Sequence, residues 1–409
     1  MLSAIMPGFG CLYSRHSRRS GGNIRSSYPV QEQVRSIHAP FSVPFVHRLR
    51  FTRDAFAAEN HTLDEVVREG TGRSPRVIVF FDRAVSEAWP GIATAARAYA
   101  ASHGWEVPPI ETLPGGEESK NDPAVLEQAL RAIHDAKIDR QSFVIAVGGG
   151  AVLDVVGYAA AIAHRGVRLV RLPTTTLSQA DSGVGVKNGI NAFGKKNYLG
   201  TFSPPWAVVN DEALLATLSD RDWRCGFAEA LKVGLVKDAV LFESIEKAAA
   251  RIQRRDETAA LPVIRESAEL HLRHITEGGD PFELISARPL DFGHWAAHKL
   301  EQMTDFQLRH GEAVAIGLAL DTTYSVKIGL LDPLEGERVL HCLSELGFRL
   351  YDEAMADSDT LLAGLDEFCE HLGGVLTLAM LRGIGNSVDI HEIEPRCARE
   401  SIEHLAQRG

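Results

Sequence analysis

The sequence predicts an α/β amino-terminal domain built on a parallel sheet, followed by an all-helical carboxy-terminal domain. Between residues 76 and 172, short apolar segments of strand type alternate with segments of helical periodicity. This alternation is typical of a parallel sheet that helices cover on both faces. After about residue 211 the strand pattern fades and only helical periodicity continues.

The strands of the first domain are apolar runs, which we expect at 76–82, 106–113, 142–147 and 167–172. The helices between them are expected at 87–101, 122–137 and 151–163. Asp122 and Pro123 suit the N-cap and first position of the second helix. Ligands of such sheets bind beyond the carboxyl ends of the strands, where we expect the site.

Helical periodicity in the second domain predicts helices at 212–250, 256–276, 291–304, 311–328, 335–347 and 360–371. We therefore divide the chain into a tail of residues 1–40, an α/β domain of residues 41–211 and a helical domain of residues 212–409.

Composition excludes several classes of protein. The 409 residues include 54 Asp and Glu against 43 Lys and Arg, so the formal net charge is −11. Nucleic-acid and membrane-surface binding both need a positive field, and no apolar run approaches the roughly 20 residues of a spanning helix. The five scattered cysteines form no Cys-x-x-Cys pair, which indicates a reducing compartment and argues against a cysteine-built zinc site.

The start of the chain is basic, since residues 1–50 hold seven arginines against one glutamate. The formal charge of residues 1–50 is therefore near +6, and that of the remaining chain is near −17. Residues 1–40 are rich in Ser and Gly without a hydrophobic period, so we expect them to be disordered. An Arg- and Ser-rich start also resembles an organelle transit peptide. An over-long start or a solvated tail is the preferred interpretation, and we expect a cytoplasmic protein.

Three glycines, Gly148, Gly149 and Gly150, stand at a strand-to-helix junction. They permit positive φ and let a pyrophosphate approach backbone N–H groups at the helix start. The pattern is not Gly-x-Gly-x-x-Gly, and a tight turn without a ligand is the alternative.

The segment 174–197 follows the next strand and reads as a long loop with hydroxyls, an aspartate and three lysines. Such composition suits a phosphorylated, polyhydroxylated ligand, whereas a solvated surface loop is the alternative. Arg165, Arg168 and Arg171 lie near it in sequence, each compatible with a phosphate contact or a solvated charge.

Possible metal ligands occur in the helical part. Glu229 and Lys232 are spaced i, i+3, and His294 and His298 are spaced i, i+4, so each pair shares one helix face. His310 follows in sequence. Two histidines and a carboxylate can bind zinc with an open fourth position, although such histidine pairs also occur as packing or surface residues.

These segments together resemble the sugar-phosphate cyclases of the 3-dehydroquinate synthase superfamily, including members like 2-epi-5-epi-valiolone synthase. The resemblance runs from about Phe41 to beyond Gly385. Its motifs occur in order, as Gly-Gly-Gly-x-x-x-Asp154, Arg165-Gly-Val, Pro-Thr174-Thr175, Asp181-Ser182, Lys187, Gly-Lys-Lys-Asn197, Ala-Glu229-x-x-Lys232, Phe-Gly-His294-x-x-x-His298 and His310-Gly-Glu312.

The resemblance implies an NAD-dependent lyase that also uses Zn²⁺ or Co²⁺ and eliminates phosphate from a sugar phosphate while closing a carbocycle. It implies an NAD-binding first domain, a metal- and substrate-binding second domain, and a homodimer. Glu229, His294 and His310 would bind the metal, and His298 would serve as an acid, a base or a phosphate contact. The implied NAD-side residues are Asp82, Glu117, Lys120, Gly149, Gly150, Asp154, Thr174, Thr175, Asp181 and Ser182. The implied substrate residues are Arg165, Lys187, Lys196, Asn197 and Lys232.

Departures from the dehydroquinate synthase pattern concern the substrate. Asp291 replaces an asparagine, Ala287 stands in the place of an arginine with Arg288 one position off, and no lysine lies between Glu266 and Asp291. Asp291 would repel a substrate carboxylate, whereas a hydroxyl can donate a hydrogen bond to it. We therefore expect sedoheptulose 7-phosphate as the C7 substrate.

Three alternatives remain. The first is 3-dehydroquinate synthase, which acts on 3-deoxy-D-arabino-heptulosonate 7-phosphate. A metal-dependent polyol dehydrogenase would not need the three lysines for a phosphate. A non-catalytic homologue would be expected to have lost metal or base residues.

Overall fold

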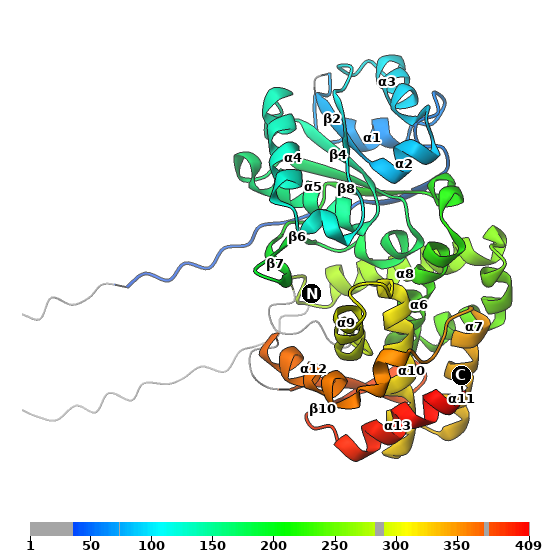
Figure 1. Ribbon diagram of the computed structural model, residues 1–409. Coiled ribbons are helices and arrows are strands. Elements are labelled where there is room, and N and C mark those ends of the chain that lie inside the picture. Colours follow the sequence, from blue (N-terminus) through cyan, green and yellow to red (C-terminus); the bar gives the residue numbers. More distant parts are fainter. Residues whose placement is uncertain (1–35, 73, 283–289, 372–375, 409) are drawn as a thin grey trace, which may run out of the picture. The chain divides into compact units, whose positions relative to one another are not determined.

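The computed structural model describes residues 36–72, 74–282, 290–371 and 376–408 (Figure 1). Residues up to Pro44 form one unit, whose described part contains no helix or strand. The predicted disorder of residues 1–40 lies almost wholly outside the described residues. The second unit, Phe45–Gly409, holds every described helix and strand.

The predicted parallel sheet is confirmed. Its six strands lie in the order β1 (Leu49–Thr52), β8 (Ala207–Asp211), β5 (Arg168–Pro173), β4 (Phe143–Gly148), β2 (Val77–Asp82) and β3 (Ile110–Leu113), and every pair is parallel. The sequence did not predict β1 or β8, and β3 begins later than the expected 106.

Helices cover both faces of the sheet. On β2, Val77 and Val79 pack with α1 (Thr62–Arg68), α2 (Arg83–Ala88) and α3 (Ile92–Ser102), whereas Ile78 and Phe80 pack with α4 (Pro123–Asp135) and α5 (Gly150–Ile162) (Figure 1). This alternation explains why buried parallel strands are apolar throughout. The helix expected at 87–101 is divided into α2 and α3, because Pro90-Gly91 cannot continue α2.

The loop expected at 174–197 is largely not a loop, and that prediction was wrong. After η3 (Ser178–Ser182), the chain forms an antiparallel hairpin of β6 (Lys187–Ala192) and β7 (Lys195–Phe202). β6 packs against α5 at Gly157, where a Cβ would lie 1.8 Å from Asn188 Oδ1. The hairpin therefore depends on a tertiary contact and not on an apolar period.

The carboxy-terminal region is helical, as predicted. It comprises η4 (Glu212–Thr217), α6 (Asp220–Lys237), α7 (Ala239–Gln253), α8 (Glu257–Glu277), α9 (His294–Met303), α10 (His310–Lys327), α11 (Pro333–Glu345), η5 (Glu353–Ala356), α12 (Ser358–His371) and α13 (Pro395–Arg408). The expected helix 212–250 is thus three helices. A hairpin of β9 (Leu378–Gly383) and β10 (Asn386–Ile390) is an addition that the sequence did not predict.

Buried α10 is the centre of this region and packs against α6, α9, α11 and α13. The division of the chain at residue 211 stays a prediction. Among the described residues, no helix combines the length and the apolar character needed to cross a bilayer.

Candidate active site

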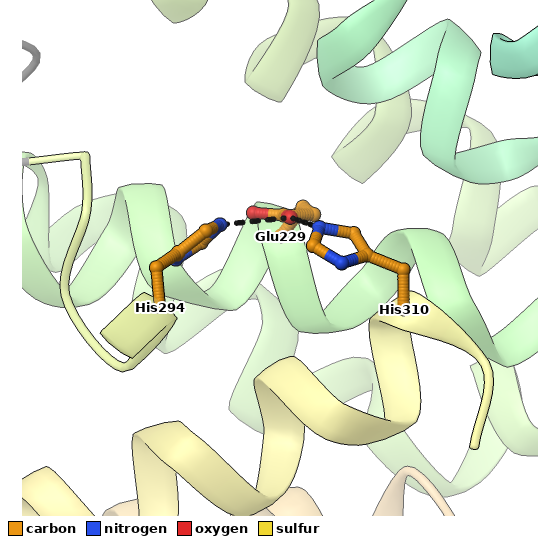
Figure 2. A group of neighbouring side chains, drawn as sticks. All are labelled: Glu229, His294 and His310. Carbon is orange, nitrogen blue, oxygen red and sulfur yellow. Dashed lines mark ion pairs between the residues drawn. The ribbon is translucent and has the colours of Figure 1, made fainter. Parts of the chain in front are cut away.

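A compact group of three side chains joins three helices. Glu229 lies within α6, and His294 and His310 are the first residues of α9 and α10. Both histidines direct Nε2 at the same oxygen, Glu229 Oε1, at 3.5 Å from His294 and 3.2 Å from His310 (Figure 2). The three ligand atoms lie within 4.8 Å of one another. Two imidazole nitrogens and one carboxylate oxygen are a donor set that suits Zn²⁺ or Co²⁺.

Buried charge surrounds this group. Glu229 is 2% exposed, and Lys232 Nζ lies 2.6 Å from its second oxygen. Burial raises the pKa of Glu229, but Lys232 and His294 outweigh burial and hold that pKa well below its usual range. Burial lowers the pKa of Lys232, but Glu229 and Asp181 raise it by more, so that the pKa lies above its usual value. Both groups are therefore charged at neutral pH.

His298 lies beside the group and does not belong to it. Its ring stacks on that of His310 at 5.9 Å and meets that of His294 edge-on at 5.6 Å. Spacing alone paired His298 with His294; the structure keeps these two rings adjacent and also brings His298 together with Glu301 and His310. Its side chain is exposed at the surface, but the protein packed around it desolvates the ring, and this desolvation together with the two neighbouring histidines lowers its pKa to about 3. His298 is therefore neutral at neutral pH.

Asp321 of α10 fixes the start of α9. Its carboxylate accepts hydrogen bonds from Gly293 N and Trp295 Nε1, both at 2.9 Å, on either side of His294. Gly293 has φ +77, and a Cβ there would lie 2.8 Å from the Leu318 backbone. Asp291, just before this turn, has both oxygens buried and raises the pKa of Lys232. Ala287 and Arg288 lie outside the described residues.

The second part of the site lies at the carboxyl ends of β4 and β5, where α5 begins. None of the three glycines there uses the positive φ that glycine permits. They permit close approach instead. A Cβ on Gly149 would lie 3.3 Å from Thr175 Cγ2, and one on Gly150 would lie 3.4 Å from Ser182 Oγ. The N-cap residue of α5 is Gly149, which has no side chain to cap the helix, so N–H groups at the helix start can receive an anion.

Lys120 connects three elements near this helix start. From η1 (Glu117–Lys120) it donates to Asp154 Oδ2 of α5 at 2.8 Å and to Asn197 of β7. Glu117 accepts a hydrogen bond from Asn191 Nδ2 at 3.1 Å. The sequence-predicted NAD-side residues Glu117, Lys120 and Asp154 are thus brought together with the hairpin.

Asp82, Thr174 and Asp181 lie at the same edge of the sheet. Asp82 ends β2, accepts from Ala84 N at 2.9 Å and would meet a Cβ on Gly115 at 2.4 Å. Thr174 N donates to Gly148 O at 3.0 Å. Asp181 in η3 pairs with His271 Nδ1 of α8 at 2.5 Å. Asp181 also raises the pKa of Lys232, and its element η3 packs against both α6 and α8.

The three arginines do not lie where we expected them. Arg168 starts β5 and donates to Gln141 O at 3.1 Å. Arg165 belongs to η2 (Ala163–Arg165), which connects the end of α5 to the start of β5. It therefore lies at the opposite edge of the sheet from the other candidate residues of this chain, because α5 has run back along the strands. Fully buried Arg171 donates to the carbonyls of Gly183, Gly185 and Lys187, and so holds the segment that precedes the hairpin.

Sequence reasoning missed Glu301, Asp321 and His271. A weak signal existed for Glu301, which lies seven residues after His294 on the same helix face, and for Asp321, an acid within an apolar helix. For His271 the sequence contains no comparable signal, because its contact with Asp181 spans 90 residues.

Two family models match the chain: 3-dehydroquinate synthase N-terminal over residues 110–225 and 3-dehydroquinate synthase C-terminal over residues 226–366. 2-Epi-5-epi-valiolone synthase of Streptomyces glaucescens is 34% identical over 304 residues, 73% of this chain and 78% of that protein. 3-Dehydroquinate synthase of Rhodopseudomonas palustris is 38% identical over 301 residues, 70% of this chain and 77% of that protein.

Solved structures agree. That of 2-epi-5-epi-valiolone synthase from Streptomyces hygroscopicus, with NAD⁺ and Zn²⁺ bound, has a TM-score of 0.82 at 29% identity, covering 91% of this chain and 100% of that one. A 2-deoxy-scyllo-inosose synthase structure shares the fold with a TM-score of 0.69 at 21% identity, and the match covers 87% of this chain and 96% of that one. The chain belongs to the 3-dehydroquinate synthase family and is a sugar-phosphate cyclase.

Proposed function

We propose that this protein cyclises sedoheptulose 7-phosphate to a carbocyclic cyclitol with loss of phosphate, using NAD and Zn²⁺ or Co²⁺. Asp291 is the observation that carries the choice of substrate. Its buried carboxylate lies close enough to Lys232 to raise the pKa of that lysine. A substrate carboxylate would meet like charge at Asp291, whereas a terminal CH₂OH can donate a hydrogen bond to it.

The donor set of Glu229, His294 and His310 fits a metal with an open coordination position. The uncapped start of α5 and the close approach that Gly149 and Gly150 allow fit the pyrophosphate of NAD. We assign the remaining NAD contacts to Asp82, Glu117, Lys120, Asp154, Thr174, Thr175, Asp181 and Ser182. When bound, NAD would accept and return a hydride, and the metal would act as a Lewis acid.

The residues of the chain bind the substrate and move its protons. Lys232 carries a fixed positive charge beside Glu229, and we assign it to ring oxygens of the sugar. Lys187, Lys196 and Asn197 of the hairpin would bind the phosphate and hydroxyls with charge-assisted hydrogen bonds. His298 would serve as an acid, a base or a phosphate contact. We further propose a cytoplasmic homodimer, with residues 41–211 binding NAD and residues 212–409 holding metal and sugar.

3-Dehydroquinate synthase is the second candidate, favoured by a curated relative of that activity at 38% identity. A paired assay separates the two. The protein with NAD and Zn²⁺ should release phosphate from sedoheptulose 7-phosphate without net NADH. Turnover of 3-deoxy-D-arabino-heptulosonate 7-phosphate alone would overturn the proposed substrate. Net NADH formation with a polyol would instead indicate a dehydrogenase, a class to which structures at 15–17% identity relate this chain by fold alone.

A further inference from the structure

We propose that Glu301 is a positioning residue that joins the metal ligand His310 to Lys196 of the hairpin. The proposal rests on the proposed function, because it takes the Glu229 group as the metal site. Glu301 lies in α9, is 3% exposed and uses both carboxylate oxygens. Oε2 lies 3.2 Å from His310 Nδ1, and Oε1 lies 2.9 Å from Lys196 Nζ.

The two nitrogens of His310 face different partners. Nε2 points at Glu229 Oε1 and Nδ1 points at Glu301. A carboxylate at Nδ1 keeps the proton on that atom, which leaves the Nε2 lone pair free for a metal. Carboxylates that hold histidine ligands in this way also fix the ring orientation, and their loss typically weakens metal binding about 10–100-fold.

The second oxygen of Glu301 holds Lys196, which is 30% exposed and lies 5.2 Å above the ring of Phe306. Lys196 comes from β7, more than 100 residues away from Glu301 in the chain. The carboxylate of Glu301 therefore connects His310 in the helical region to Lys196 in the hairpin. Its negative charge is matched by Lys196 on one oxygen, while the N–H of His310 Nδ1 faces the other oxygen.

The experiment compares the wild-type protein with the variants Glu301→Gln, Lys196→Met and Glu367→Gln, each prepared without metal. The last is a matched control, because Glu367 of α12 is 51% exposed and forms an ion pair with Lys299, which lies on α9 as Glu301 does. Zn²⁺ affinity is measured by competition with a chromophoric chelator, and Co²⁺ binding by visible absorption. Acetylation of the Lys196 amine, followed by peptide mass spectrometry, reports on the other contact.

We expect Glu301→Gln to weaken metal binding about 10–100-fold and to alter the Co²⁺ spectrum. Lys196→Met and Glu367→Gln should stay within about twofold of the wild type in Zn²⁺ affinity. Acetylation of Lys196 should be faster in Glu301→Gln and unchanged in Glu367→Gln. If Glu301→Gln does not fold, Glu301→Asp, which keeps the charge and withdraws it by one methylene, takes its place.

Metal affinity of Glu301→Gln within about twofold of the wild type, where the wild type binds metal, would overturn the role of Glu301 toward His310. Unchanged acetylation would overturn its role toward Lys196. A wild-type protein that binds neither metal would contradict the proposed function instead, and the acetylation measurement would still decide whether Glu301 holds Lys196.

Discussion

The two sides of the candidate site are built by opposite means. At the start of α5, Gly149 and Gly150 have no side chain, which leaves space for a ligand, and the groups that can bind it are backbone N–H donors. Around Glu229, the site is made of buried charges that neutralise one another. A site made of space is damaged by an added atom, whereas a site made of balanced charge is damaged when one partner is removed.

The largest effect should follow from removing the charge of Glu229. Glu229→Gln deprives both histidines and Lys232 of their shared anion. A metal that acts as a Lewis acid is worth several kcal/mol, so kcat/KM for phosphate release should fall about 1,000-fold or more. Metal content after gel filtration should fall with it. Glu246→Gln, at an exposed pair with Arg338, is the control, and a variant that keeps its metal would contradict the comparison.

Arg171 tests the comparison from the sheet side, where it is a buried charge. Its guanidinium also donates to Asn188 Oδ1 at 2.6 Å, besides the three carbonyls. Arg171→Met leaves these acceptors without a donor, at about 1–3 kcal/mol for each buried group. We expect urea denaturation to show a loss of about 3 kcal/mol or more. If the urea midpoint of Arg171→Met equals that of Arg338→Met, a variant at an ion pair on the surface, the hydrogen bonds of Arg171 are not needed to hold residues 183–188.

Asp291→Asn sharpens the account of the helical side by keeping shape and removing charge. The amide is a weaker acceptor for a terminal hydroxyl, so kcat/KM with sedoheptulose 7-phosphate should fall about tenfold, the value of roughly one charged hydrogen bond. Steady-state phosphate release measures this. An unchanged rate would remove Asp291 from the argument about substrate.

Gly150→Ala adds one methyl group where the protein itself has room, 3.4 Å from Ser182 Oγ. Thermal stability should be unchanged or slightly raised, because alanine is the better helix residue. NAD binding, measured by calorimetry, should weaken about tenfold, since a hydrogen bond from the helix start is obstructed. Gly91→Ala, which meets nothing within 4 Å, is the matched control. Equal affinity in both variants would place the pyrophosphate elsewhere.

The smallest effect concerns pH. Burial raises the pKa of Asp321 to about 7, and Asp291 adds to this. A raised carboxyl pKa contributes stability that is complete below the unfolded value and is lost as pH rises through the folded value. The Tm of Asp321→Asn should therefore lie further below that of the wild type at pH 5 than at pH 8. A difference that does not change with pH would show that Asp321 is ionised throughout.

Local patterns predicted the elements that local patterns determine. β4 and α5 were found because an apolar run leads directly into glycines and a helical period. The β6–β7 hairpin was missed because Lys187–Asn188-Gly189 carries no strand pattern, and its place depends on α5 and Arg171. β1 pairs with β8 across about 160 residues, a contact that no window of sequence reports.

The same distinction holds for the site. The histidines and Glu229 were identified because their residue types and order resemble a family, and the structure brings them together. Glu301 and Asp321 are ordinary acids in the sequence. Only packing makes them buried partners of His310 and of Gly293, so their importance could not be inferred from helical spacing.

Helix α9 presents His294, His298 and Glu301 from one face over two turns. Inserting one residue between them would rotate every later side chain by about 100° and move Glu301 away from His310. Relatives that keep both the metal group and the contact of Glu301 should therefore keep the number of residues between His294 and Glu301 constant.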